Sequence, residues 1–281
     1  MAKAVGVIYH PMIGAARDLS ERLVECLAGL DAKAWVCSSW DEEGMAVHRQ
    51  GTDMAISVGG DGTILRVART VAAWDIPIVG VNMGHLGFMT EFSAAEVMAK
   101  LPAVLAGDCW VDRRAMLQVD LCCQSGDAGA KETTCHGLND ALVGRGPVPR
   151  IVNVATTVNG APLSNYRADA VLVSTATGST GYSLAAGGPI LHPQSEEIVL
   201  KPVSAHLSLP YALVLPSTAE VRMVVHTHYE AVLSVDGQVN IPVRDGDAVS
   251  ARRSPHSIRF LRTSPPELFY SALEKRLKVR E

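Results

Sequence analysis

The sequence lacks several features that would assign it to a specialised class of protein. No apolar run approaches the ~20 residues that span a bilayer, because Gly, Ser, Thr or Pro interrupts each one. Aromatic residues make up only 5% of the 281 residues, and the formal net charge is −4. A base-stacking platform and a large basic surface for nucleic acid are therefore not expected. We predict neither a membrane nor a nucleic acid as partner.

Cysteine motifs are also missing. The six cysteines show no CxxC spacing, and a chain of this length can fold without disulfide bonds. The sequence therefore predicts reduced thiols in a cytoplasmic protein. Residues 1–9 contain one lysine, a short apolar run and no cleavage pattern. They predict a buried strand and not a signal peptide.

What is present is the composition of an ordinary globular protein. Apolar residues make up 48% and charged residues 19%, which excludes disorder as the main state. The 24 glycines and 15 prolines have no three-residue period, so a collagen-like chain is excluded too. The length suggests about two domains.

The first hundred residues alternate between strand and helix patterns. Strands are predicted over 5–9, 34–37, 54–58 and 76–81, and helices over 19–30 and 64–73. Ser93 and Glu96 have the spacing of a capping box before a further helix over 97–105. Strands that alternate with helices predict an α/β domain with a parallel sheet.

Beyond residue 107 the strand patterns follow one another directly. They cover 151–158, 170–174, 221–226, 232–235, 239–243 and 258–261, with hairpin-type dipeptides at 159–160, 236–237 and 245–246. One short helix is predicted over 180–186. A second capping box at 264–267 precedes a C-terminal helix whose apolar stripe is Phe269, Ala272, Leu273 and Leu277. We predict an α/β domain over 1–107, completed by about 263–281, and a β-rich domain over 108–262.

The clearest chemical motif is GGDGT at residues 59–63, between a predicted strand and a predicted helix. Glycines let the backbone turn sharply and let a ligand approach closely. The helix that follows offers free N–H groups and a positive dipole end, which suit phosphate. A helix cap alone needs only Asp61, so three glycines around it favour a binding site.

Three weaker motifs lie in the β-rich half. Residues 175–182 read TATGSTGY, a pattern of small hydroxyl residues and glycines that can present N–H donors to phosphate or ribose. Asn139 and Asp140 could bind a base edge or a ribose, although such a pair is more often a turn. Asp236-Gly237 predicts a plain hairpin turn.

Other patterns point away from further sites. GxGxxG, GxxxxGK[ST] and GxSxG are all absent. His226 and His228 lie on one face of a predicted strand, but without a third ligand they predict exposed histidines and not a metal site. Arg113 and Arg114 are predicted to be solvated charges.

Taken in order, these motifs resemble the NAD kinase family, of the bacterial type that uses ATP or polyphosphate. GGDGT is followed by NMGHLGF at 82–88, Asn139-Asp140, TATGSTGY running into AGGPI at 186–190, HLS at 206–208 and DGQ at 236–238. GGDGT alone also occurs in diacylglycerol and sphingosine kinases, and phosphofructokinases have a relative of it. Its combination with TGSTGY and AGGPIL is far more specific, and the resemblance covers nearly the whole chain.

The resemblance implies transfer of a phosphoryl group from ATP, or from polyphosphate, to the 2′-hydroxyl of the adenosine ribose of NAD. The product is NADP. It implies that Asp61 is the general base and that Mg²⁺ or another divalent metal takes part, with ligands that the sequence does not identify. The donor's phosphates are expected at Gly59, Gly60, Gly62, Thr63 and Arg66.

The resemblance also implies how NAD is held and how the chain assembles. The family places its active site in a cleft between the two domains, returns its C-terminal helix to the first, and forms dimers or tetramers through the β-rich domain. NAD is then contacted by residues of two subunits. The residues expected to bind NAD are Asn139, Asp140, Arg150, Arg167, Asp169, Thr177, Thr180, Gly181, Tyr182, Ser183, Leu184, Ala185 and Gln238.

Three positions depart from the family's usual pattern. Asp140 stands where the family usually has Glu, which shortens the side chain by one methylene. Ala176 replaces a proline, and Gly181 replaces an alanine. The donor range and the preference between NAD and NADH stay open.

Two alternative functions remain at this point. The first is a lipid or sugar kinase that shares the GGDGT loop, which the 175–182 and 236–238 motifs and the lack of a basic amphipathic face disfavour. The second is a non-catalytic regulator that binds NAD, which the presence of Asp61 disfavours.

Overall fold

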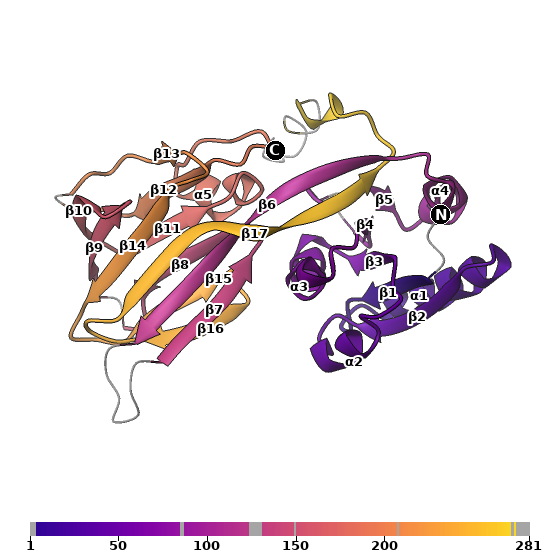
Figure 1. Ribbon diagram of the computed structural model, residues 1–281, viewed down its shortest axis with the longest axis horizontal. Helices are drawn as coiled ribbons and strands as arrows, with labels where there is room; N and C mark the ends of the chain where they lie inside the picture. The colour runs from indigo at the N-terminus through magenta and orange to yellow at the C-terminus, as the bar shows by residue number, and fades with distance from the viewer. Residues whose placement is uncertain are drawn as a thin grey trace. The chain divides into compact units, whose positions relative to one another are not determined.

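The computed structural model describes residues 4–84, 87–123, 131–148, 150–206, 208–270 and 273. The chain divides into two compact units (Figure 1). Unit 1 comprises Met1–Arg113 and Ile258–Glu281, and unit 2 comprises Arg114–Ser257. Two long strands, β6 (Trp110–Cys123) and β17 (Ala248–Arg262), each begin in one unit and end in the other.

Unit 1 is built on a parallel sheet with the strand order β2-β1-β3-β4. The short strand β5 pairs with β4 in parallel, and Phe260 of β17 pairs with Ile78 of β4. Every residue of β3 and β4 is buried, as expected for strands of a parallel sheet covered on both faces. The strands are β1 (Ala4–Tyr9), β2 (Lys33–Ser38), β3 (Met54–Gly59), β4 (Ile78–Asn82) and β5 (Phe92–Ser93).

Helices connect these strands. The one that matters most for the site is α3 (Asp61–Val71), which follows β3 after the single residue Gly60. Its buried residues recur at helical spacing, and its first turn carries Asp61, whose charge suits the positive end of the helix dipole. The others are α1 (Gly14–Gly29), α2 (Glu42–Val47), the 3-10 turn η1 (Ala72–Trp74) and α4 (Val97–Ala106).

Unit 2 consists of two antiparallel sheets. Strands β10, β9, β14, β17, β6 and β7 form the first, and β13, β12, β11, β8, β15 and β16 the second. The remaining bounds are β7 (Lys131–Gly137), β8 (Asp140–Arg145), β9 (Val152–Val158), β10 (Ala161–Ala168), β11 (Ala170–Ser174), η2 (Gly178–Thr180), α5 (Tyr182–Ala185), β12 (Ile198–Val203), β13 (Leu213–Leu215), β14 (Glu220–His226), β15 (Ala231–Val235) and β16 (Val239–Val243).

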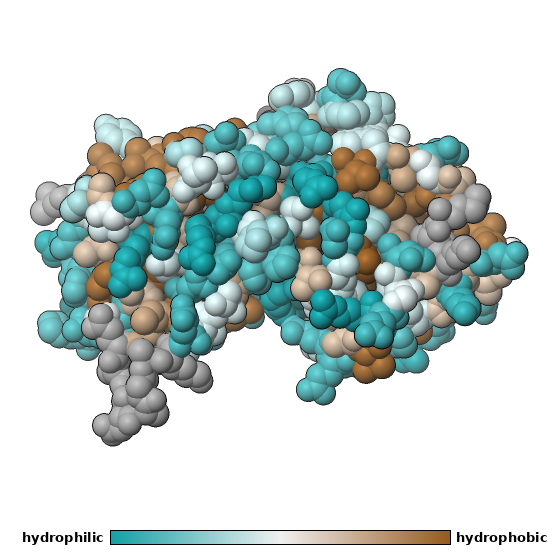
Figure 2. All heavy atoms as spheres, viewed as in Figure 1, coloured by the Kyte–Doolittle hydropathy of each residue, from teal (hydrophilic) through white to brown (hydrophobic). Residues whose placement is uncertain are grey.

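One apolar core joins the inner faces of these two sheets. It contains Leu117 and Val119 of β6, Tyr166 of β10 and Val173 of β11, all without exposed surface. The outward face of β6 and β17 is polar instead, and Asp120 and Arg252 form an ion pair there at 2.8 Å. Hydrophilic residues gather over these strands in Figure 2.

The predicted fold class is confirmed, and most predicted strands lie within a few residues of observed ones. The hairpin prediction holds at Asn159 and Asp236, which have φ of 50° and 53° and are each followed by a glycine with positive φ. The prediction of the Ser93–Glu96 capping box was only half right. Ser93 N–H donates to Glu96 Oε2 at 3.0 Å, but Ser93 Oγ donates to the same carboxylate. The N-cap residue of α4 is Glu96 and not Ser93, although the helix begins at Val97 as predicted.

Seven strands were missed: β5, β6, β7, β8, β10, β12 and β13. In β6 the buried positions include Asp112 and Arg114, whose charged side chains have partners. Buried charges hide the alternation by which a strand is recognised. The predicted helix over 180–186 is shorter, since Gly181 separates η2 from α5.

The C-terminal helix is only partly described. Residues 268–270 are helical, as is 273, whereas Ala272 and Leu277 of its predicted stripe lie outside the described residues. Within the described part of the chain, no helix has both the length and the apolar character needed to cross a membrane. All six cysteines are thiols.

Candidate functional site

The GGDGT motif places Asp61 at the first position of α3, directly beyond the carboxyl end of β3. Its side chain is half-buried, and both carboxylate oxygens accept backbone hydrogen bonds. Phe88 N–H donates to Oδ2 at 2.7 Å, and Met89 N–H donates to Oδ1 at 3.1 Å. A carboxylate has about four lone-pair sites, so Asp61 keeps acceptor capacity for a ligand. The carboxylate is therefore held in one orientation and can still accept further hydrogen bonds.

The glycines around Asp61 have two different roles. A Cβ on Gly87 would lie 2.1 Å from Asp61 Oδ1, and one on Gly59 would lie 2.2 Å from Thr63 Oγ1. These two glycines leave room for the protein's own side chains. Gly60 and Gly62 have no neighbour within 4 Å of an added Cβ. They leave open space beside the chain where a ligand could approach.

Thr63 and Arg66 complete this part of the site on the first two turns of α3. Thr63 Oγ1 is buried and has no hydrogen-bond partner in the described part of the chain. Arg66 is half-buried, and its guanidinium carbon lies 5.7 Å from the centre of the Trp40 ring. Among the described residues no group of three or more His, Cys, Asp and Glu could hold a metal ion.

The second group of predicted residues lies in unit 2 and is organised by Asp236. This buried carboxylate accepts N–H bonds from Leu138 at 2.9 Å, Asn139 at 2.7 Å and Asp140 at 3.1 Å. Asp236 N–H in turn donates to Asp140 O at 2.9 Å. The sequence predicted a plain hairpin turn at Asp236. The turn is present, but its carboxylate also has distant backbone partners. Asp236 holds the backbone of Asn139 and Asp140 in place.

Asp140 is the first residue of β8 and is buried. Burial, and secondly the nearby negative charge of Asp236, raise the pKa of Asp140 to about 7. At neutral pH its carboxyl group therefore exists as a mixture of protonated and ionised forms. It can donate or accept a hydrogen bond there.

The loop of the TATGSTGY motif packs against the same residues. Thr175 Oγ1 donates to Leu138 O at 2.6 Å, and Thr175 N–H donates to Asn139 O at 2.9 Å. A Cβ on Gly178 would lie 2.1 Å from Asn139 O, so this glycine permits the contact. Asn139 Oδ1 has no hydrogen-bond partner among the residues described, which leaves an acceptor for a ligand.

The rest of this motif continues through η2 and α5. Thr180 Oγ1 donates to Thr177 O at 3.2 Å. Thr177 Oγ1 accepts a bond from the guanidinium of Arg114 at 3.3 Å. Arg114 is buried, so the prediction that it is a solvated charge was wrong. Asn139, Asp140, Gly178 and Gly181 thus lie together, and the segment to which Tyr182, Ser183, Leu184 and Ala185 belong follows directly.

Arg167 and Asp169 lie at the other end of β11 from this cluster. In the register of β11 with β8, Ser174 is opposite Asp140, and Ala170 is opposite Gly144. Four residues of strand span about 13 Å, so Asp169 is well separated from Asp140. Asp169 instead forms an ion pair with Arg145 at 3.2 Å. Gln238 lies in the turn after Asp236, where its N–H donates to Val235 O.

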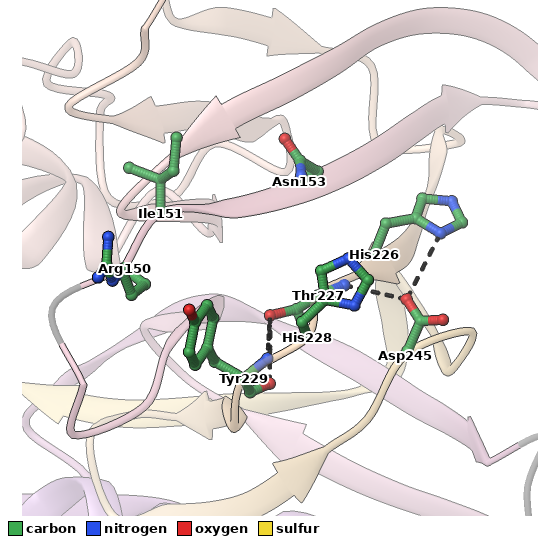
Figure 3. Close-up of a pocket in the computed structure, with 8 residues that line it drawn as sticks. All are labelled: Arg150, Ile151, Asn153, His226, Thr227, His228, Tyr229 and Asp245. Atoms are coloured by element: carbon green, nitrogen blue, oxygen red, sulfur yellow. Dashed lines mark hydrogen bonds and ion pairs between the residues drawn. The ribbon is translucent and has the colours of Figure 1, made fainter.

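Arg150 lines a separate cavity of about 430 Å³, drawn in Figure 3. Its guanidinium lies 5.8 Å from the ring centre of Tyr229. Asp245 contacts the Nδ1 atom of His226 at 3.8 Å and accepts the Thr227 N–H at 3.0 Å, as the dashed lines show. His228 lies beyond the end of β14, so it does not share a strand with His226 as predicted. Both histidines are exposed.

Two residues that shape the site, Asp236 and Gly87, were not identified from the sequence. The amides that Asp236 binds are 96 to 98 residues away, and no local pattern marks such a contact. Gly87 lies in the glycine-rich 82–88 motif, and that motif was the available signal.

Comparison with known proteins identifies relatives of this chain. Residues 7–109 match the ATP-NAD kinase N-terminal domain, and residues 138–263 match the ATP-NAD kinase C-terminal domain. The chain is 43% identical over 278 residues to an NAD kinase of Dehalococcoides mccartyi strain CBDB1, covering 99% of this chain and 97% of that protein. It is 38% identical over 280 residues to the NAD kinase of Chloroflexus aggregans, covering 99% of each.

Solved structures share the fold. Yeast NADH kinase complexed with NADH has a TM-score of 0.82 at 23% identity, covering 99% of this chain and 89% of that one. An NAD kinase from Archaeoglobus fulgidus in complex with ATP has a TM-score of 0.76 at 24% identity, covering 97% and 98%. Together with the curated relatives, which match over almost the full length, these comparisons show that the chain belongs to the NAD kinase family.

Proposed function

We propose that this protein is an NAD kinase, which transfers the terminal phosphoryl group of ATP to the 2′-hydroxyl of the adenosine ribose of NAD, giving NADP and ADP. The observation that carries the proposal is the fixed orientation of the Asp61 carboxylate. Two backbone amides orient this carboxylate beside glycines whose backbone is open to a ligand. That is what a general base next to a phosphate-binding loop requires.

In the proposed reaction, Asp61 accepts the proton of the ribose 2′-hydroxyl as that oxygen forms a bond to the γ-phosphorus. The bond between the γ-phosphorus and the β–γ bridging oxygen breaks, and its electron pair leaves with ADP. Because phosphoryl transfer depends mainly on positioning and charge stabilisation, the fixed orientation of Asp61 is its main contribution. The free lone pairs of the carboxylate receive the proton.

We assign the donor's phosphates to Gly59, Gly60, Gly62, Thr63 and Arg66. The open backbone at Gly60 and Gly62 supports this assignment, as do the N-terminus of α3 and the unused hydroxyl of Thr63. Mg²⁺, or another divalent metal, usually binds through substrate phosphates, water and one or two carboxylates. The residues described here fit that mode, with Asp61 and Thr63 as candidate ligands. When bound, the metal would neutralise charge on the phosphates.

We assign NAD to the residues around Asn139. The free Oδ1 of Asn139 can accept a bond from the adenine amino group, and Asp140 can bond a ribose hydroxyl in either protonation state. The neighbouring loop would line the same site. Its members are Thr177, Thr180, Gly181, Tyr182, Ser183, Leu184 and Ala185, with Gln238 from the turn after Asp236.

The remaining predicted residues support the proposal of an oligomer. Arg167 and Asp169 lie a strand's length from Asp140, and Arg150 lines a different cavity. We propose that these three contact NAD bound to another copy, in a homodimer or homotetramer formed through the β-rich domain. We also keep as proposals the domain division at residues 107 and 262, a cytoplasmic location and polyphosphate as a second donor.

The test is a coupled assay on the purified full-length protein. ATP, Mg²⁺ and NAD are added with a dehydrogenase that uses only NADP, and NADPH absorbance is followed. A rising signal supports the proposal. No signal from folded protein that binds NAD in a titration would indicate a regulator, and no signal without NAD binding would return the search to lipid and sugar acceptors.

A further inference from the structure

An exposed tryptophan lies at the end of the unit 1 sheet where the GGDGT loop begins. Trp40 follows β2, just as the GGDGT loop follows β3. Trp40 is 53% exposed. Ligands of open parallel sheets bind at the carboxyl ends of the strands. A lone exposed apolar residue needs no explanation, but this one stands at the end of the sheet where a ligand is expected.

Trp40 is held in place by its surroundings. Its backbone N–H donates to Ser38 Oγ at 3.2 Å, and the next residue, Asp41, caps α2 by accepting the Gly44 N–H at 2.8 Å. The ring of His10, which follows β1, meets the indole edge-on with centroids 6.1 Å apart. The backbone at Trp40 is thus anchored, and its indole lies against the ring of His10.

Arg66 connects Trp40 to the phosphate-binding loop. It lies four residues after Gly62, so both are on one face of α3, and helical side chains lean toward the N-terminus. Its guanidinium carbon is 5.7 Å from the centre of the Trp40 ring, within the range of a cation–π contact. The guanidinium of Arg66 therefore lies near the indole, on the helix that begins at the GGDGT loop.

The spacing along the sheet suits a nucleotide. With the order β2-β1-β3, Trp40 is two strands from the GGDGT loop, about 10 Å at the usual strand spacing. The two are also linked by backbone bonds, from Ser39 N–H to Tyr9 O and from His10 N–H to Val58 O, both 2.9 Å. A nucleoside triphosphate spans a comparable distance from its γ-phosphate to its base.

We propose that Trp40 is the stacking surface for the base of the nucleoside triphosphate donor, with Arg66 placed between that base and the phosphates. The inference rests on the proposed function, because it assigns the donor of that reaction. It implies that ATP gains affinity from its base, which an inorganic polyphosphate cannot do.

The direct test is tryptophan fluorescence of the full-length protein, titrated with Mg²⁺ and a non-hydrolysable ATP analogue. Stacking should quench Trp40, and the quench should be absent in Trp40→Phe and retained in the matched control Trp74→Phe. Trp74 lies in η1, before the amino end of β4. Magnesium tripolyphosphate, which has no base, should cause little quenching.

Kinetics give the second readout. Loss of a base–aromatic stack typically weakens binding enough to raise the KM for ATP about tenfold in Trp40→Ala. The KM for NAD should stay within about twofold, and Trp40→Phe should recover part of the loss. Any activity with polyphosphate should be the same in Trp40→Ala and in the unaltered protein.

Several results would overturn the inference. These are an unchanged KM for ATP in Trp40→Ala, a quench that persists in Trp40→Phe, an equal quench by tripolyphosphate, or a quench by NAD in place of the ATP analogue. If the analogue quenches Trp40 but no NADP forms, this inference stands and the proposed NAD kinase activity fails.

Discussion

Two carboxylates, Asp61 in unit 1 and Asp236 in unit 2, do similar work in different surroundings. Each accepts backbone N–H bonds from a segment that is not its neighbour in sequence. Asp61 accepts two such bonds and remains half-exposed, whereas Asp236 accepts three and is buried. The half-exposed group can still take a proton from a ligand. The buried carboxylate of Asp236 uses its hydrogen-bond acceptors on backbone amides, so it acts as a positioning residue.

The largest expected effect comes from removing the proposed general base, Asp61. Asp61→Asn should lower kcat by about 10²-fold or more in the NADP-coupled assay, while the affinity for NAD stays close to normal. Asp53→Asn is a matched control, since Asp53 accepts one backbone N–H from Ala4 at 3.0 Å. Nearly unchanged turnover in Asp61→Asn would make Asp61 a turn residue.

Altering the positioning carboxylate should produce a different pattern. In Asp236→Asn, the side-chain amide cannot accept bonds at its NH₂ end, so at least one buried N–H loses its acceptor. We expect a loss of about 1–3 kcal/mol in the free energy of unfolding and a KM for NAD raised about tenfold. Denaturant titration and steady-state kinetics measure the two.

The control for that variant is Asp31→Asn, which changes an exposed aspartate that, like Asp236, has a positive φ. It should leave the KM for NAD unaltered. An Asp236→Asn protein with the KM of the unaltered enzyme would show that the 138–140 backbone does not need this carboxylate.

Glycine substitutions near Asp61 separate two effects. One is the orientation of the Asp61 carboxylate, and the other is the access of a ligand to the GGDGT loop. Gly87→Ala places a Cβ against Asp61 Oδ1, so the carboxylate must move, and a misplaced base should lower kcat about fivefold to tenfold. Gly60→Ala meets no protein atom within 4 Å and should instead raise the KM for ATP a few-fold. Equal effects of both variants on kcat would contradict this division.

The smallest expected effect is a pH dependence of stability caused by Asp140. Its pKa is about 7 in the folded protein against an ordinary value of 3.8. The raised pKa adds to the free energy of unfolding below pH 3.8, where Asp140 is protonated in both states. This contribution is lost as the pH rises through 7. Asp140→Asn cannot ionise, so its Tm should exceed that of the unaltered protein by about 3 °C or more at pH 7.5.

This difference should shrink steadily between pH 7 and pH 4, as followed by thermal unfolding. A difference that is constant with pH would mean that Asp140 ionises normally. The same variant should bind NAD less well, because an amide cannot replace the carboxylate on a ribose hydroxyl.

The sequence predicted the donor half of the site better than the acceptor half. GGDGT is a continuous motif between a strand and a helix, so its position at the end of β3 followed from periodicity alone. The amide donors of Phe88 and Met89 did not, although their segment was singled out as glycine-rich. In unit 2 the individual motifs were found, but the carboxylate that holds Asn139 and Asp140 was read as a hairpin turn.

The same reason explains the errors in the fold. Elements with a clean apolar period, such as β3 and α3, were predicted to within a few residues. Strand β6 was missed because its buried positions include Asp112 and Arg114, which form hydrogen bonds with residues elsewhere in the chain. Local patterns report local geometry, whereas a buried charge depends on a partner that no local pattern reveals.

The sequence separation of the two carboxylates also has a consequence for how the protein is made. The amides that bind Asp61 lie 27 and 28 residues away, whereas those that bind Asp236 lie 96 to 98 residues away. Closing a long loop costs more chain entropy and comes later in folding. On the ribosome, the Asp61 loop can close once residue 89 has emerged. The backbone of Asn139 and Asp140 can be held in this way only after Asp236 has emerged as well.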